Sequence, residues 1–97
     1  MCLTKTQLIK LKTTAQTIKP TIQIGREGLT PGQLDRINQE LAHRELVKIR
    51  FNHHKDQKTR ISQEITAKTQ ATQVDLIGNT LVLYRQSPDP EKRKHLI

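Results

Sequence analysis

The chain has few of the residues on which stacking surfaces and disulfide scaffolds depend. Its 97 residues include no tryptophan, one phenylalanine, one tyrosine and a single cysteine, Cys2. One cysteine cannot form an internal disulfide, which fits a reducing cytoplasm. We expect the Cys2 thiol to lie in a frayed terminus rather than to be a reactive group.

Long apolar runs are missing as well. No stretch approaches the roughly 20 consecutive apolar residues that a membrane-spanning helix needs. The N-terminal segment also lacks the apolar centre of a signal peptide. The sequence therefore predicts a cytoplasmic protein with no membrane partner.

Negative charge is scarce throughout the chain. Seventeen Lys and Arg residues face nine Asp and Glu residues, for a net charge of +8 and a pI near 10.1. Residues 1–26 contain no acid and carry the basic side chains Lys5, Lys10, Lys12, Lys19 and Arg26. This imbalance predicts a polyanionic partner such as a nucleic acid.

No motif for catalysis or metal binding is evident. The acids form no catalytic pair, and no nucleophile stands beside a base in any known pattern. The four histidines, His43, His53, His54 and His95, lack the spacing of a structural zinc site. We therefore expect no enzyme activity, no metal and no cofactor.

The two aromatic residues offer little for base stacking. We expect Phe51 in the core, and Tyr84 packed on a sheet with its hydroxyl in water rather than stacked on a base. Recognition should then depend on phosphates, riboses and shape, with low sequence specificity.

Glycine is also scarce, and one pair of glycines is the most informative feature of the sequence. Gly25, Arg26, Glu27 and Gly28 follow a short β-like run and precede a helix start at Thr30. Two glycines let a ligand approach the backbone closely, and a helix N-terminus offers N–H groups and positive charge. These four residues are our predicted phosphate-backbone site, although a plain strand-to-helix turn would also favour glycine. The carboxylate of Glu27 is the one unfavourable charge.

The apolar spacing predicts three helices and four strands. The first two helices each begin with a predicted capping box, Thr4 with Gln7 and Thr30 with Gln33. The predicted helices cover residues 5–17, 31–44 and 58–70, and the predicted strands cover residues 21–24, 46–51, 72–77 and 80–85. Gly78-Asn79 should form the last hairpin turn.

This order, α-β-α-β-α-β-β, predicts a two-layer α/β fold with a four-stranded mixed sheet, with the helices covering one face. Residues 1–86 should form one domain. Residues 87–97 contain Pro88, Pro90 and a run of charged residues, and we expect them to form a flexible basic tail.

Lys5, Lys12 and Lys19 recur every seven residues. We predict that they form a strip that tracks an RNA backbone beside the glycine pair. The alternative is a solvated helix face, which is what charge runs usually are.

Four segments resemble the CRM domain family (chloroplast RNA splicing and ribosome maturation), above all its single-domain bacterial YhbY-type members. They read Ile-Lys-Pro (18–20), Ile-Gly-Arg-Glu-Gly-Leu-Thr (24–30), Glu-Leu-Val-Lys-Ile (45–49) and Ile-Gly-Asn-Thr-Leu-Val-Leu-Tyr-Arg (77–85). The resemblance implies a fold similar to the C-terminal domain of translation initiation factor three, and RNA binding through the Gly-x-x-Gly loop. We add Arg85, which closes the last segment, to the candidate RNA contacts.

The same resemblance suggests a partner. Bacterial single-domain members are linked to precursors of the large ribosomal subunit, and plant relatives to group II intron splicing. We therefore expect a monomeric rRNA-binding maturation factor. A DNA-binding nucleoid protein and, less favoured, an enzyme for a small phosphate ligand remain as alternatives.

Overall fold

The computed structural model describes residues 3–95. Its elements, in chain order, are α1 (Lys5–Ala15), β1 (Ile22–Ile24), α2 (Pro31–Arg44), β2 (Leu46–Phe51), η1 (Lys55–Gln57), α3 (Lys58–Thr69), β3 (Thr72–Ile77), β4 (Thr80–Tyr84) and η2 (Pro90–Lys92), where η marks a short 3₁₀ helix. The predicted α/β class and element order are confirmed, and β2 and β3 have the predicted bounds. Cys2 lies outside the described residues.

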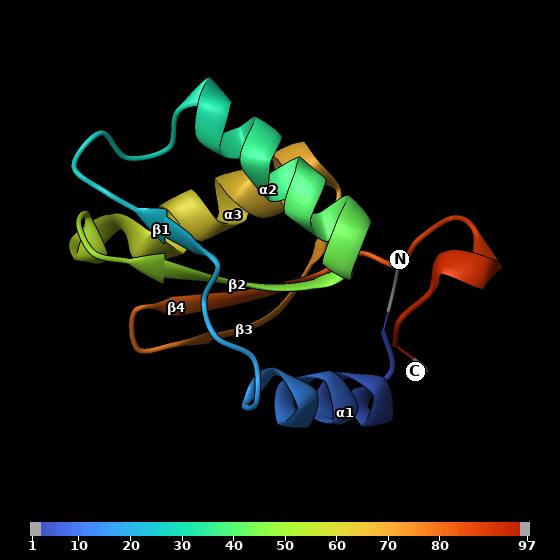
Figure 1. The fold of residues 1–97 in the computed structure, drawn as a ribbon. Coiled ribbons are helices and arrows are strands. Elements are labelled where there is room, and N and C mark those ends of the chain that lie inside the picture. The colour runs from blue at the N-terminus through green and yellow to red at the C-terminus, as the bar shows by residue number, and fades with distance from the viewer. Residues whose placement is uncertain (1–2, 96–97) are drawn as a thin grey trace.

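The four strands form one mixed sheet in the order β1-β2-β4-β3 (Figure 1). β1 and β2 are parallel, whereas β4 is antiparallel to both β2 and β3. The second strand–helix–strand unit therefore does not pair its own strands, because β4 lies between β2 and β3. The hairpin at Gly78-Asn79 directs the chain into that central position.

Helices α2 and α3 cover one face of the sheet, which we call the closed face (Figure 1). The apolar side chains between them form the larger hydrophobic core. Its buried residues are Ile22, Ile24, Ile37, Leu41, Val47, Ile49, Phe51, Ile61, Ile65, Leu81 and Leu83. Phe51 lies in this core, as predicted.

Helix α1 lies on the opposite face, which differs from the expectation that the helices share one face (Figure 1). Its buried Leu11 and Ala15 pack against Leu46 and Val82 of the sheet. In β2, Lys48 alternates with apolar neighbours, as in a strand with one wet face, but α1 covers part of this face. Thus α1 adds a partial third layer.

The helix starts follow the predicted chemistry, with one correction. Thr4 and Gln7 form a complete capping box. The Thr30 hydroxyl accepts from the Gln33 backbone N–H at 3.1 Å, so Thr30 is the N-cap of α2. The reciprocal half predicted for Gln33 is wrong, because its side-chain amide instead donates to the Gln23 carbonyl at 2.7 Å.

Residues 87–95 turn back onto the junction between α2 and β2. Glu45 ends α2 with a positive φ of 65° and is only 1% exposed. Its carboxylate accepts backbone N–H groups of Ser87, Lys94 and His95. Three N–H donors compensate for the burial of this charge. The flexibility of the tail and a domain boundary at residue 86 stay predictions.

Candidate nucleic-acid interface

Residues 25–28 form a tight turn between β1 and α2, which we call the glycine turn. The Gly28 N–H donates to the Gly25 carbonyl at 3.0 Å and closes it. Arg26 and Glu27 stand at its tip with exposed side chains. The predicted geometry of a strand, a turn and a capped helix is therefore present.

The two glycines of the turn have different reasons for being glycine. Gly28 has a φ of +70°, which disfavours any side chain, and the ring of His54 lies 3.6 Å from where its Cβ would be. Gly25 has no positive φ, and nothing lies within 4 Å of its Cβ position. The fold itself thus accounts for Gly28 but leaves Gly25 unexplained. A glycine that the scaffold does not need is what a close backbone contact with a ligand would require.

Donors for an anion come mainly from the turn rather than from the helix. Among the described residues, the backbone N–H groups of Arg26 and Glu27 have no acceptor within the protein. At the start of α2, Pro31 has no N–H, and the N–H groups of Gln33 and Leu34 are bonded to Thr30. The sequence argument from the helix N-terminus therefore overestimated the number of free donors there.

His54 braces the turn from a second loop. Its ring Nε2 lies 2.7 Å from the Arg26 carbonyl, a hydrogen bond in which the ring must donate. The backbone of His54 is in the left-handed region, with φ 58° and ψ 35°, which aims the side chain at the turn. The spacing of the histidines, which argues against a structural zinc site, gives no sign of this contact. Only its place three residues after the end of β2, beside the end of β1, could have suggested this contact.

The three predicted lysines are exposed, and two of them lie away from the turn. Lys5 and Lys12 lie on α1, across the sheet from α2 (Figure 1). Lys19 lies in the segment that links α1 to β1. The prediction that Lys5 and Lys12 lie directly beside the turn is therefore wrong. Their contact with RNA stays a prediction.

Arg85 is committed to internal bonds. Its guanidinium donates to the side chain and backbone carbonyl oxygens of Asn38 and to the Thr69 carbonyl, at 2.8 to 3.0 Å. It thereby joins the end of β4 to α2 and α3, and burial lowers its pKa. These bonds argue for a structural role, so we do not include Arg85 in the interface proposed below.

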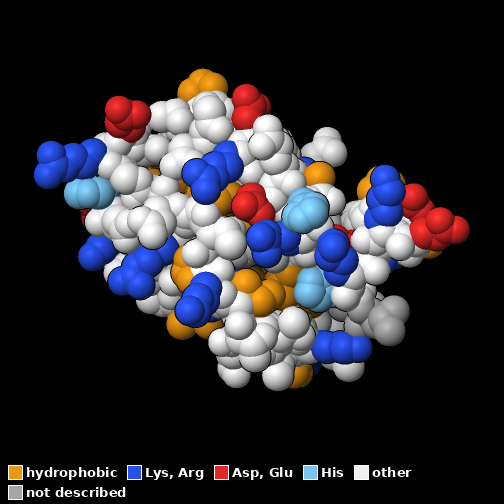
Figure 2. Space-filling view, viewed as in Figure 1, with side chains coloured by type: hydrophobic (Ala, Val, Ile, Leu, Met, Phe, Trp, Pro, Cys, Tyr) orange, Lys and Arg blue, Asp and Glu red, His pale blue; other side chains and the backbone are white. Residues whose placement is uncertain are grey.

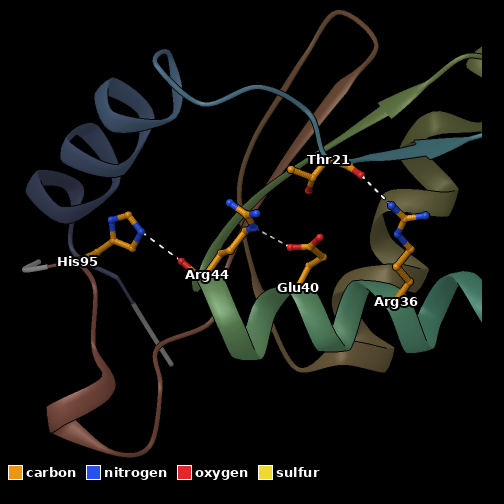
Figure 3. Close-up of polar contacts among 5 residues, drawn as sticks. All are labelled: Thr21, Arg36, Glu40, Arg44 and His95. Atoms are coloured by element: carbon orange, nitrogen blue, oxygen red, sulfur yellow. Dashed lines mark hydrogen bonds and ion pairs between the residues drawn. The ribbon is translucent and has the colours of Figure 1, made fainter.

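Several cations of α2 are also tied to neighbours (Figure 3). Arg44 pairs with Glu40 at 2.8 Å, and its carbonyl lies 3.3 Å from the His95 ring. Arg36 reaches the Thr21 carbonyl at 3.5 Å. These contacts hold α2 to the entry of β1 and to the tail. They leave the cations at the surface, where they still contribute positive potential.

Lys and Arg side chains spread over the visible surface, with few acids between them (Figure 2). Tyr84 does not contribute to this surface. It is fully buried, its hydroxyl included, and its ring meets His95 edge-on at 6.3 Å. The expected wet hydroxyl is therefore wrong, and burial raises the Tyr84 pKa.

In residues 3–95, no group of three His, Cys, Asp or Glu side chains could hold a metal ion. Within the same residues, no helix is long and apolar enough to cross a membrane.

Comparison with known proteins gives consistent matches. The family model of the CRS1 / YhbY (CRM) domain matches residues 3–85. An RNA-binding protein of Haemophilus influenzae is 39% identical over 80 residues, which is 81% of each chain. A probable RNA-binding protein of Pseudomonas aeruginosa is 29% identical over 93 residues, 95% of this chain and 89% of that one. The solution structure of a hypothetical protein from Staphylococcus aureus superposes with a TM-score of 0.79 at 29% identity, over 96% of this chain and 98% of the other.

Proposed function

This chain belongs to the CRS1/YhbY (CRM) domain family, and from that premise we propose that it binds RNA through the glycine turn and the basic surface around it. The observation that carries the proposal is Gly25, a glycine that neither its torsion angle nor its surroundings require. Its curated relatives are named RNA-binding proteins.

The chemistry of the turn suits a phosphate. The unbonded N–H groups of Arg26 and Glu27 can donate to phosphate oxygens, and the Arg26 side chain adds a charge-assisted contact. Since neither glycine has a side chain, the backbone of the RNA can reach these donors. The net charge of +8 supplies the long-range attraction.

The proposed partner is the rRNA of large ribosomal subunit precursors, on which the protein acts as an assembly factor. This rests on the family resemblance. We further propose that it works by binding rather than by catalysis, as a cytoplasmic monomer. The hollow at the turn supports binding rather than catalysis, because Glu27 is the one acid in its lining.

The test is crosslinking in cells with sequencing of the bound RNA, together with gradient sedimentation. We expect crosslinks in large-subunit rRNA and co-sedimentation with its precursors more than with mature ribosomes, released by RNase. Co-sedimentation with chromosomal DNA that resists RNase would instead favour a nucleoid protein.

A further inference from the structure

Helix α1 covers only part of its face of the sheet. The strand register shows which side chains lie on the uncovered part. Gln23 pairs with Arg50, Arg50 with Thr80, and Thr80 with Ile77. Since paired residues point to the same side, these four form one row across the sheet, which we call the open row. Three of them are exposed, and Ile77 is 60% exposed, an uncommon position for a large apolar side chain.

A cleft lies where the open row meets α1. It has a volume of about 140 Å³ and a floor that includes Ala15, Ile77 and Val82. Such a floor suits one face of a flat, weakly polar ring. Both aromatic residues, Phe51 and Tyr84, are buried, so the apolar lining of the cleft is aliphatic.

The rim of the cleft carries both signs of charge. Lys12 of α1 and Lys48 of β2 stand on it, and the Lys48 ammonium also donates to the Ala15 carbonyl at 3.1 Å. The one acid is Asp75 of β3. Its Oδ1 accepts the Leu76 N–H at 2.9 Å, which leaves Oδ2 and the second lone pair of Oδ1 to accept from a ligand.

A β-bulge puts Asp75 in this position. The register of β3 shifts between Gln73 and Asp75. As a result Val74 packs into the α1 cluster while Asp75, the next residue, still lines the cleft on the same side. Bulges commonly redirect a side chain at a functional site.

The open row connects this cleft with the glycine turn. Gln23 stands two residues before Gly25 at one end, and Ile77 lines the cleft at the other. Three strand spacings separate these ends, about 14 Å. A strand of RNA held at the turn can therefore cross the row with Arg50 beneath it.

We infer that the cleft is a second RNA subsite, which takes one unpaired base from the strand that the glycine turn holds. Asp75 accepts hydrogen bonds from the base, and Lys12 and Lys48 face its phosphates. A carboxylate selects bases with amino groups, guanine foremost because it offers two adjacent N–H donors, and uracil least. The inference rests on the proposed function and replaces the expected low specificity by a preference at one position.

The experiment uses the full chain and short uridine strands that differ at one central position. We expect the strand with guanine to bind roughly five- to tenfold more tightly than the all-uridine strand. Asp75→Asn should reduce this ratio to under about twofold. Asparagine keeps an oxygen for the Leu76 N–H, so the fold is preserved. Asp35→Asn, on the exposed side of α2, removes the same charge and should keep the ratio.

Amide chemical shifts give a second readout on the unmodified protein. The guanine strand should shift the signals of residues 75–77 and 80–82, and the all-uridine strand should shift them less. Equal binding of all strands, or a ratio unchanged in Asp75→Asn, would overturn the subsite while leaving the proposed function intact. Failure of every strand to bind would overturn both.

Discussion

The two faces of the sheet differ in the residues that they carry and in how far helices cover them. Every buried strand residue of the closed face is apolar, and two helices cover it. On the other face Lys48, Arg50 and Asp75 interrupt the apolar pattern, and one helix covers only part of it. We infer from this comparison that the closed face contributes most of the stability. The face with α1, together with the glycine turn at its edge, keeps exposed surface that a ligand can contact.

The largest expected effect, and the strongest test of this difference between the faces, comes from truncating a core side chain of the closed face. Phe51→Ala removes a fully buried ring from the closed face, and we expect a loss of about 3–5 kcal/mol in the free energy of unfolding. Urea denaturation measures it. The folded fraction should still bind RNA with the affinity of the parent, and a parallel loss of affinity under folding conditions would contradict this difference.

The two glycines of the turn test the same difference between stability and binding at single residues. Gly28→Ala places a side chain at a φ of +70° and should cost about 1 kcal/mol of stability. Gly25→Ala meets open space and should change stability by under about 0.5 kcal/mol. Thermal melts of the pair decide this, and equal losses would mean that Gly25 also serves the scaffold.

His54 should matter for binding more than for folding. His54→Asn keeps a residue that tolerates the left-handed backbone but is too short to reach the Arg26 carbonyl. We expect RNA affinity to fall roughly three- to tenfold, the worth of one net hydrogen bond. The neighbouring His53→Asn is the control, and if both variants bind equally the brace has no role in binding.

The smallest expected effect is a change of salt dependence. Lys12→Ala should make the log–log slope of affinity against salt shallower by under about one unit. Lys68, which pairs with Glu64 on α3, is the matched control, and Lys68→Ala should leave the slope unchanged. Titrations at several salt concentrations measure both. The same slope in Lys12→Ala and the parent would remove α1 from the interface.

Local signals in the sequence predicted most of the elements, because caps, alternation and turn residues act over a few positions. Thr4 with Gln7, Thr30 and the hairpin at Gly78-Asn79 are examples. The glycine turn was predicted for the same reason.

Contacts between distant segments could not be read this way. Nothing near Glu45 in the sequence indicates that its carboxylate meets N–H groups of the tail, and Arg85 gives no sign that Asn38 and Thr69 lie beside it. The bonds between Gln33 and Gln23, and between His54 and Arg26, likewise depend on strand ends that only the fold brings together. The side of the sheet that α1 covers also depends on tertiary packing, which local sequence signals do not show.

The most direct test of the central claim, that the glycine turn binds RNA, is the affinity of two charge variants at fixed salt. Gly25→Asp puts a carboxylate where the phosphate should approach and should weaken binding by about tenfold or more, whereas Glu27→Lys should strengthen it. Gln63→Glu, which adds the same charge on exposed α3, is the control, and thermal melts verify that all three variants are folded. If folded Gly25→Asp and Glu27→Lys both bind RNA as the parent does, the turn is not the RNA site.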